Sequence, residues 1–243
     1  IIFLVVLTFA ATLAGVDGLR SQEGASNVAR SQTEIRFRFY RWQEDHLWLS
    51  RKTEPLSDYE RLKYLHLGGA PENYLSLGGE MRYRLDHYEP YLFGLTASGR
   101  NWSSNQERIF LHADLHLSRY FRSFVQFDAA KEDGRPIQRS YDQSSLDLRQ
   151  AFGDLILPAG TESVMLRAGR QELWLGPSRW LSVRDSANIH RTFDGGLVEY
   201  HGANFTFRGF VARPVSINPG LFDDSTSSGE FFRGFYAILN QPI

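Results

Sequence analysis

The chain has 243 residues, a formal net charge of -1 and no cysteine. Its 42% hydrophobic and 14% aromatic residues can bury a sizeable core, which excludes general disorder. The lack of cysteine excludes disulfides and thiolate metal sites, and the small net charge gives no global attraction to nucleic acid. Lysine occurs only at Lys52, Lys63 and Lys131, so most basic side chains are arginines, whose planar donor groups suit carboxylates.

The first 18 residues, IIFLVVLTFAATLAGVDG, are apolar and end in small residues, which is typical of a secretory signal peptide. The run is short for a membrane-spanning helix, which needs roughly 20 residues. It has no methionine and no positively charged start, so we expect a signal peptide at 1–18 that lacks its beginning. Residues 19–73 are then a periplasmic lead segment, in which Ser57 and Glu60 form a capping box that predicts one short helix.

From Tyr74 onward the dominant hydrophobic period is two. The clearest case is YLSLGGEMRYRLDHY, in which Leu75, Leu77, Met81 and Leu85 alternate with small or charged residues, so that the two faces of the strand differ. We predict eight strands, at 74–87, 108–118, 123–131, 146–157, 164–173, 195–200, 204–213 and 230–239.

The predicted connections alternate between long and short, which places all long loops at one end of the strands. Outer-membrane barrels have this asymmetry. Aromatic residues near the predicted strand ends fit interfacial girdles; they are Tyr74, Tyr88, Tyr91, Tyr120, Phe121, Trp174 and Tyr200. We therefore predict an all-β fold, a transmembrane antiparallel up-and-down β-barrel, whose N-terminal part is residues 74–243.

In such a barrel the polar face of each strand lines a wet lumen. By alternation the lining residues are Glu80, Arg82, Arg84, Asp86, His112, Asp114, His116 and Asp128. The segment HADLH does not predict a metal site, because a strand rising about 3.3 Å per residue separates its two histidines by about 13 Å. The segment FDDSTSSGE could hold calcium in an outer loop or be an acidic loop without an ion. We predict no metal, no cofactor and no catalytic residue.

The pattern Arg-x-x-Phe-x-Asp, at Arg149, Phe152 and Asp154, is followed by LRAGRQEL at 166–173. With RWQEDHLWL, LKYLHLG and YLSLGGEMRYR, these motifs resemble the alginate export family of outer-membrane porins. The resemblance implies a monomeric barrel that passes an anionic polysaccharide through an arginine-rich constriction. It implies that Arg149 and Arg170 contact the cargo and that Asp154 is a counter-charge. It also implies a longer chain and a barrel of about 16–18 strands, of which this is a part.

Arg167 is a further pore-lining candidate that conflicts with Arg170. The two arginines are three residues apart, so they fall on opposite faces of a regular strand. Either Gly169 marks a β-bulge or one arginine lies at the rim.

The function predicted from the sequence is a non-enzymatic outer-membrane channel for passive export of an alginate-like polysaccharide. Alternatives are a porin of the same family for small anions or nutrients, an outer-membrane lipid-modifying enzyme, and a soluble all-β periplasmic binding protein. The predicted partners are outer-membrane lipid and lipopolysaccharide, the anionic polysaccharide or small anions, and periplasmic secretion-complex proteins, without nucleic acid.

Overall fold

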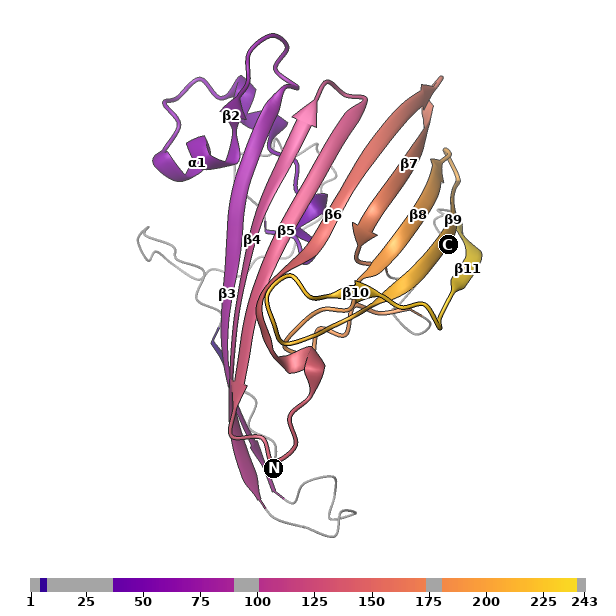
Figure 1. Ribbon diagram of the computed structural model, residues 1–243. Coiled ribbons are helices and arrows are strands. Elements are labelled where there is room, and N and C mark those ends of the chain that lie inside the picture. Colours follow the sequence, from indigo (N-terminus) through magenta and orange to yellow (C-terminus); the bar gives the residue numbers. More distant parts are fainter. Residues whose placement is uncertain (1–4, 8–36, 90–100, 174–180, 240–243) are drawn as a thin grey trace, which may run out of the picture.

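The computed structural model describes residues 5–7, 37–89, 101–173 and 181–239, most of which form one curled antiparallel sheet (Figure 1). Its long strands are β3 (Tyr74–Tyr88), β4 (Trp102–Leu117), β5 (Phe121–Asp133), β6 (Ser144–Ala159), β7 (Glu162–Gln171), β8 (Phe193–His201), β9 (Phe205–Ser216) and β11 (Phe232–Leu239). The short strands are β1 (Val5–Leu7), β2 (Leu65–His66) and β10 (Ser225–Thr226). The helices are α1 (Asp58–Lys63) and the 3-10 helices η1 (Arg41–Gln43), η2 (Leu47–Arg51) and η4 (Ser140–Asp142). Within the described ranges, every helix is too short or too polar to cross a membrane.

The long strands follow one another as an up-and-down meander. Strands β3 to β9 pair in chain order, and β11 pairs with β9. The predicted antiparallel all-β fold and its eight strands are confirmed, and the described residues form an open sheet that is consistent with part of a barrel. The short strands were not predicted, because two or three residues show no readable alternation. The capping box is confirmed at the start of α1, where Ser57 and Glu60 exchange hydrogen bonds.

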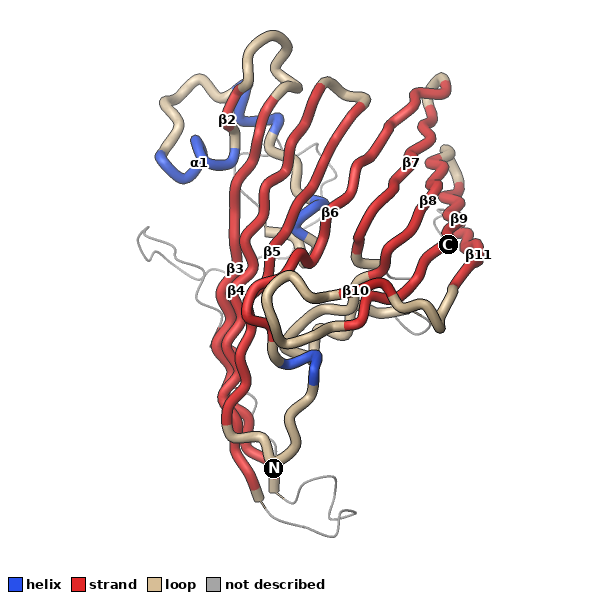
Figure 2. Tube along the Cα trace, in the orientation of Figure 1, coloured by secondary structure: helices blue, strands red, loops and turns tan. Residues whose placement is uncertain are grey.

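The connections show the predicted asymmetry (Figure 2). Short turns at 118–120, 160–161 and 202–204 join strands at one end of the sheet, which we call the short-turn end. The β3–β4, β5–β6, β7–β8 and β9–β11 connections are longer and leave the sheet at the other end, the long-loop end. This arrangement is typical of outer-membrane barrels.

The two faces of the sheet differ in polarity. On β3, Met81 and Leu85 are 55% and 51% exposed, whereas Arg82 and Asp86 are 7% and 8% exposed. We call the face that carries Arg82 the inner face and the opposite one the outer face. The alternation continues along β4. The buried face is therefore the polar one, as in a barrel strand between lipid and a wet interior, and the reverse of a strand in a soluble sheet.

The residues predicted to form aromatic girdles do not all lie on the outer face. Tyr120 and Phe121, at the short-turn end, are 39% and 41% exposed. Tyr74 is 1% exposed because its ring stacks on that of His116, so the girdle prediction is wrong for Tyr74. Two further girdle candidates lie outside the described residues, Tyr91 and Trp174.

Gly169 has the most constrained backbone in β7. Its φ is +130°, and a Cβ added there would overlap the carbonyl oxygen of Ala151 on β6. The nearest neighbour of a Cβ at Gly196, on β8, would lie 3.7 Å away. We expect Gly169→Ala to lower the free energy of unfolding by about 1–3 kcal/mol and Gly196→Ala to leave it nearly unchanged. Urea unfolding of the full-length protein in lipid vesicles measures both free energies. Equal losses for the two substitutions would contradict the special backbone requirement at Gly169.

Candidate functional site on the inner face

Charged side chains of the inner face form ion pairs across neighbouring strands. Glu80 of β3 accepts a 2.6 Å hydrogen bond from Arg108 of β4. Asp114 of β4 is 3% exposed and pairs with both Arg122 and His116. Opposite charges therefore neutralise each other along this face, and neither is left buried alone.

Arg149 lies at a β-bulge and is fully buried. The pairing register of β5 and β6 shifts at this residue. Its side chain is 0% exposed, and Nε donates to Asp128 at 3.1 Å. Nη2 donates to Asp224 at 2.8 Å, and Nη1 donates to the backbone carbonyl of His190 at 3.1 Å. Protein acceptors therefore surround the guanidinium that the resemblance assigned to cargo.

Arg167 and Arg170 belong to two separate ion pairs. Arg167 is 3% exposed and donates to both carboxylate oxygens of Asp154, at 2.6 and 2.7 Å. Arg170 makes a similar bidentate pair with Asp194, at 2.9 and 3.1 Å. The β6–β7 register is continuous, so Gly169 marks no bulge there, and Arg170 is next to last in β7 at the long-loop end.

The other predicted lining residues also lie on the inner face. Arg82 donates to two backbone carbonyls of the β7–β8 connection. Arg84 pairs with Asp86 at 2.8 Å. His112 and His116 take part in no three-residue cluster of metal-ligating side chains within the described ranges. The structure thus gathers these residues on one face, whereas Arg170, three residues from Arg167 on a strand of regular register, falls on the opposite face. The part of the predicted set in selectivity stays a prediction.

Residues 37–63 pack against the inner face at the short-turn end (Figure 1). The Trp42 ring makes an edge contact with Phe152, and Arg167 Cζ lies 4.1 Å from its centroid. The Phe39 ring stacks on His190 of the β7–β8 connection, with 6.0 Å between ring centroids. The segment therefore reaches across the inner face from one end of the sheet to a loop from the other.

Glu44 fastens this N-terminal segment. It is 4% exposed, and one oxygen accepts hydrogen bonds from the Arg38 backbone N–H at 3.1 Å and from Arg41 at 3.0 Å. Lys63 Nζ lies 3.8 Å from the other oxygen. Burial raises the pKa of Glu44, but His46, the Arg38 N–H, Arg41 and Lys63 together lower this pKa to about 2. The carboxylate is therefore charged at neutral pH.

Residues 181–192 of the β7–β8 connection fold back over the inner face from the long-loop end. Asn188 is 0% exposed and donates to three backbone carbonyls, two of them on β4 and β5. His190 Nδ1 lies 2.6 Å from Glu172 Oε1, and His190 Nε2 lies 3.0 Å from Asp185 Oδ1. The length of this connection predicts a loop at the end of the strands, and its fold back over the inner face was not predicted. An apolar residue in this polar connection, Ile189, was a usable sequence signal for burial, and in the structure its side chain is 1% exposed.

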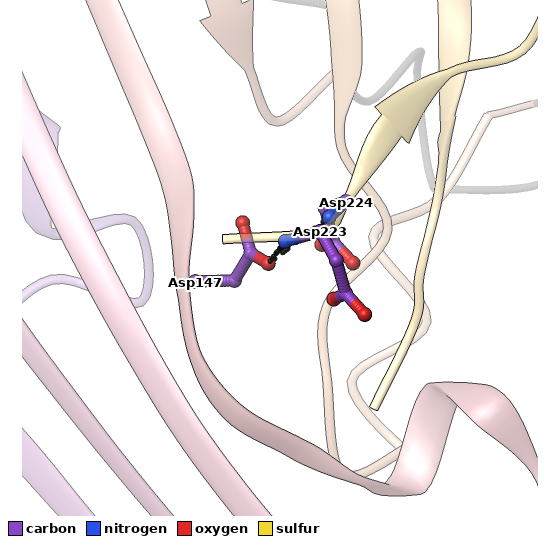
Figure 3. Close-up of side chains that lie close together, drawn as sticks. All are labelled: Asp147, Asp223 and Asp224. Atoms are coloured by element: carbon purple, nitrogen blue, oxygen red, sulfur yellow. Dashed lines mark hydrogen bonds between the residues drawn. The ribbon is translucent and has the colours of Figure 1, made fainter. Parts of the chain in front are cut away.

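Asp147, Asp223 and Asp224 bring three carboxylates within 4.8 Å of one another (Figure 3). Asp147 Oδ2 accepts the backbone N–H groups of Asp223 and Asp224, at 2.9 and 3.0 Å. The Asp224 carboxylate accepts the Asn218 backbone N–H and the Arg149 guanidinium. Backbone N–H groups and the Arg149 guanidinium therefore compensate the charge of these carboxylates, and the cluster holds the β9–β11 connection against β6.

The family comparison agrees with this architecture. A family model described as alginate export matches residues 73–237. The chain belongs to the alginate export family. The match covers β3 to most of β11 and leaves the N-terminal segment 37–72 outside it.

No curated protein and no solved structure shows significant similarity to the chain. The alginate export family is a family of outer-membrane porins, and its transport role agrees with a curled strand meander that is apolar outside and polar inside. The family resemblance found in the sequence is thereby confirmed.

Proposed function

We propose that this chain forms part of the wall of an outer-membrane channel through which an alginate-like anionic polysaccharide passes passively. The inverted polarity of the sheet, in a member of the alginate export family, carries the proposal. An apolar outer face suits lipid and lipopolysaccharide, and a polar inner face suits a hydrated carboxylate polymer. In this proposal residues 1–18 are a signal peptide, 19–73 a periplasmic lead, and the short-turn end faces the periplasm, where secretion-complex proteins could meet it.

The inner face would carry the polymer along paired charges. Arg149 and Arg167 each lie within reach of carboxylates of the inner face, and Arg170 pairs with Asp194 at the long-loop end. A polymer that slides over such pairs meets donors whose charge is already partly compensated, so each contact is weak enough to release. In this proposal the polymer passes beside the N-terminal segment and residues 181–192, which meet over the inner face where Phe39 stacks on His190.

Planar-bilayer recording of the full-length protein tests this proposal. We expect an anion-selective current that oligouronates block and that neutral dextrans of equal length do not. A current indifferent to oligouronates would refute the polysaccharide cargo, and block by monomeric uronate alone would favour the small-anion porin. Lack of any pore, with the protein in the soluble periplasmic fraction, would favour a binding protein.

A further inference from the structure

Three arginines lie near one another on the outer face, at the long-loop end of β7, β8, β9 and β11, which pair side by side (Figure 1). Arg170 of β7 lies opposite Asp194 of β8, and Asp194 lies opposite Arg213 of β9. Arg233 of β11 lies opposite Val211, two residues closer to the short-turn end on β9. Residues that lie opposite each other share a face, and Val211 is 49% exposed on the outer one. We call Arg170, Arg213 and Arg233 the outer arginine patch.

Two of the three arginines have a charge that the described part of the chain does not compensate. Arg170 donates to both oxygens of Asp194, at 2.9 and 3.1 Å. The Thr226 hydroxyl donates to the same carboxylate, so its oxygens are already occupied. Arg213 and Arg233 are exposed, and within the described ranges neither forms an ion pair. The patch therefore presents two guanidinium groups that can accept an anion from outside the chain.

The outer surface next to the patch is apolar. On the side of the short-turn end, two rows of residues follow Arg233 across β7, β8, β9 and β11. The first row is Leu166, Val198, Gly209 and Phe235, and the second is Val164, Tyr200, Phe207 and Ala237. Val198 and Phe235 are 44% and 79% exposed. The same four strands thus change from basic to apolar along their length, which suits a ligand with an anionic head and hydrocarbon chains.

The corresponding end of β5 does not have this free positive charge. Lys131 lies on the outer face of β5 and pairs with Asp133 at 2.7 Å. Its neighbour on β4 is another carboxylate, Glu107. The charge of Lys131 is therefore balanced within the chain, and this lysine is a matched control for the patch.

The chemistry of the patch selects a phosphorylated lipid. Guanidinium groups bind phosphate through two parallel hydrogen bonds. Lipopolysaccharide bears phosphate groups where its sugars meet its acyl chains, the order in which basic and apolar groups follow each other here. We propose that Arg213 and Arg233 bind a phosphate group of lipopolysaccharide, whose acyl chains lie on the apolar rows. This inference rests on the proposed function, because that function places the long-loop end at the outer surface of the outer membrane.

Native mass spectrometry of the full-length protein in detergent measures the binding, with lipid A, the phosphorylated membrane anchor of lipopolysaccharide, as the probe. The double variant Arg213→Gln/Arg233→Gln is expected to weaken lipid A binding by at least about tenfold, because it removes charged hydrogen-bond donors. Lys131→Gln removes a cation that has its own carboxylate, and is expected to bind lipid A as the wild type does. Equal lipid A binding by the double variant and the wild type would overturn the proposal.

Lipid A without its phosphate groups tests the phosphate contact separately. The wild type is expected to bind this dephosphorylated lipid at least about tenfold more weakly than lipid A. The double variant should bind it as the wild type does, which also shows that the apolar rows are intact. If the double variant loses both lipids equally, the arginines support the apolar surface and do not bind phosphate. Inorganic phosphate that displaces lipid A at equal concentration would refute a lipid site in favour of a small-anion site.

The two proposals fail in different measurements. A channel that oligouronates block, together with lipid A binding that the double variant retains, would overturn only the lipid contact of the outer arginine patch. Lack of a pore, together with lipid A binding that the double variant loses, would overturn only the transport function.

Discussion

Replacement of Arg149 by alanine is expected to lower the free energy of unfolding of the full-length protein by about 3–5 kcal/mol. The guanidinium is 0% exposed and donates to Asp128 and Asp224, whose side chains are also 0% exposed in these pairs. Alanine leaves both carboxylates buried without their cation, and this is the costly outcome for a buried ion pair. Urea unfolding in lipid vesicles, followed by tryptophan fluorescence, gives the change.

Two variants show whether the loss comes from the buried charge. Addition of Asp128→Asn to Arg149→Ala should restore part of the stability, because one uncompensated carboxylate is removed. Lys131→Ala removes the cation of a pair on β5 whose partners are 67% and 63% exposed, and should change stability little. If Arg149→Ala instead leaves stability unchanged and alters only the block by oligouronates, then Arg149 contacts cargo as the family resemblance implies.

Much of the wall could be predicted from the sequence because lipid and a wet interior impose opposite polarities on alternate residues. Met81 and Arg82 are neighbours in the chain, yet one is 55% exposed on the outer face and the other is 7% exposed on the inner face. The long and short connections then gave the order and direction of the strands. These signals are local or depend on spacing, so a single sequence contains them.

The pairing of the inner charges could not be predicted in the same way. Alternation assigns a residue to a face and says nothing of its partner. Arg149 meets Asp224 from a connection 75 residues further along the chain, and a bulge displaces it from the regular pattern. The inward fold of residues 181–192 depends on such contacts too, for Arg82 binds carbonyls more than 100 residues away. Long-range partners of this kind come from the tertiary structure.

Acidification is expected to release the N-terminal segment from the inner face through the protonation of Glu44. The pKa of Glu44 falls from its ordinary value of 4.5 to about 2 in the folded protein. A lowered carboxylate pKa stabilises the folded state above pH 4.5, and this stabilisation is lost as the pH falls from 4.5 to 2. The full loss amounts to about 3 kcal/mol. Hydrogen exchange of residues 37–52, corrected for intrinsic rates, should therefore rise over this interval and stay constant between pH 7 and pH 5.

Glu44→Gln separates this carboxylate from the other acidic groups. The neutral amide carries no negative charge, so Arg41 and Lys63 lose the partner that they have in the wild type. Hydrogen exchange of residues 37–52 should therefore be faster at pH 7 and should change less below pH 4.5. Asp58→Asn removes a fully exposed carboxylate from the same segment and should keep the wild-type profile. If the wild type and Glu44→Gln respond to acid alike, while β4 stays protected in both, a group other than Glu44 fastens the segment.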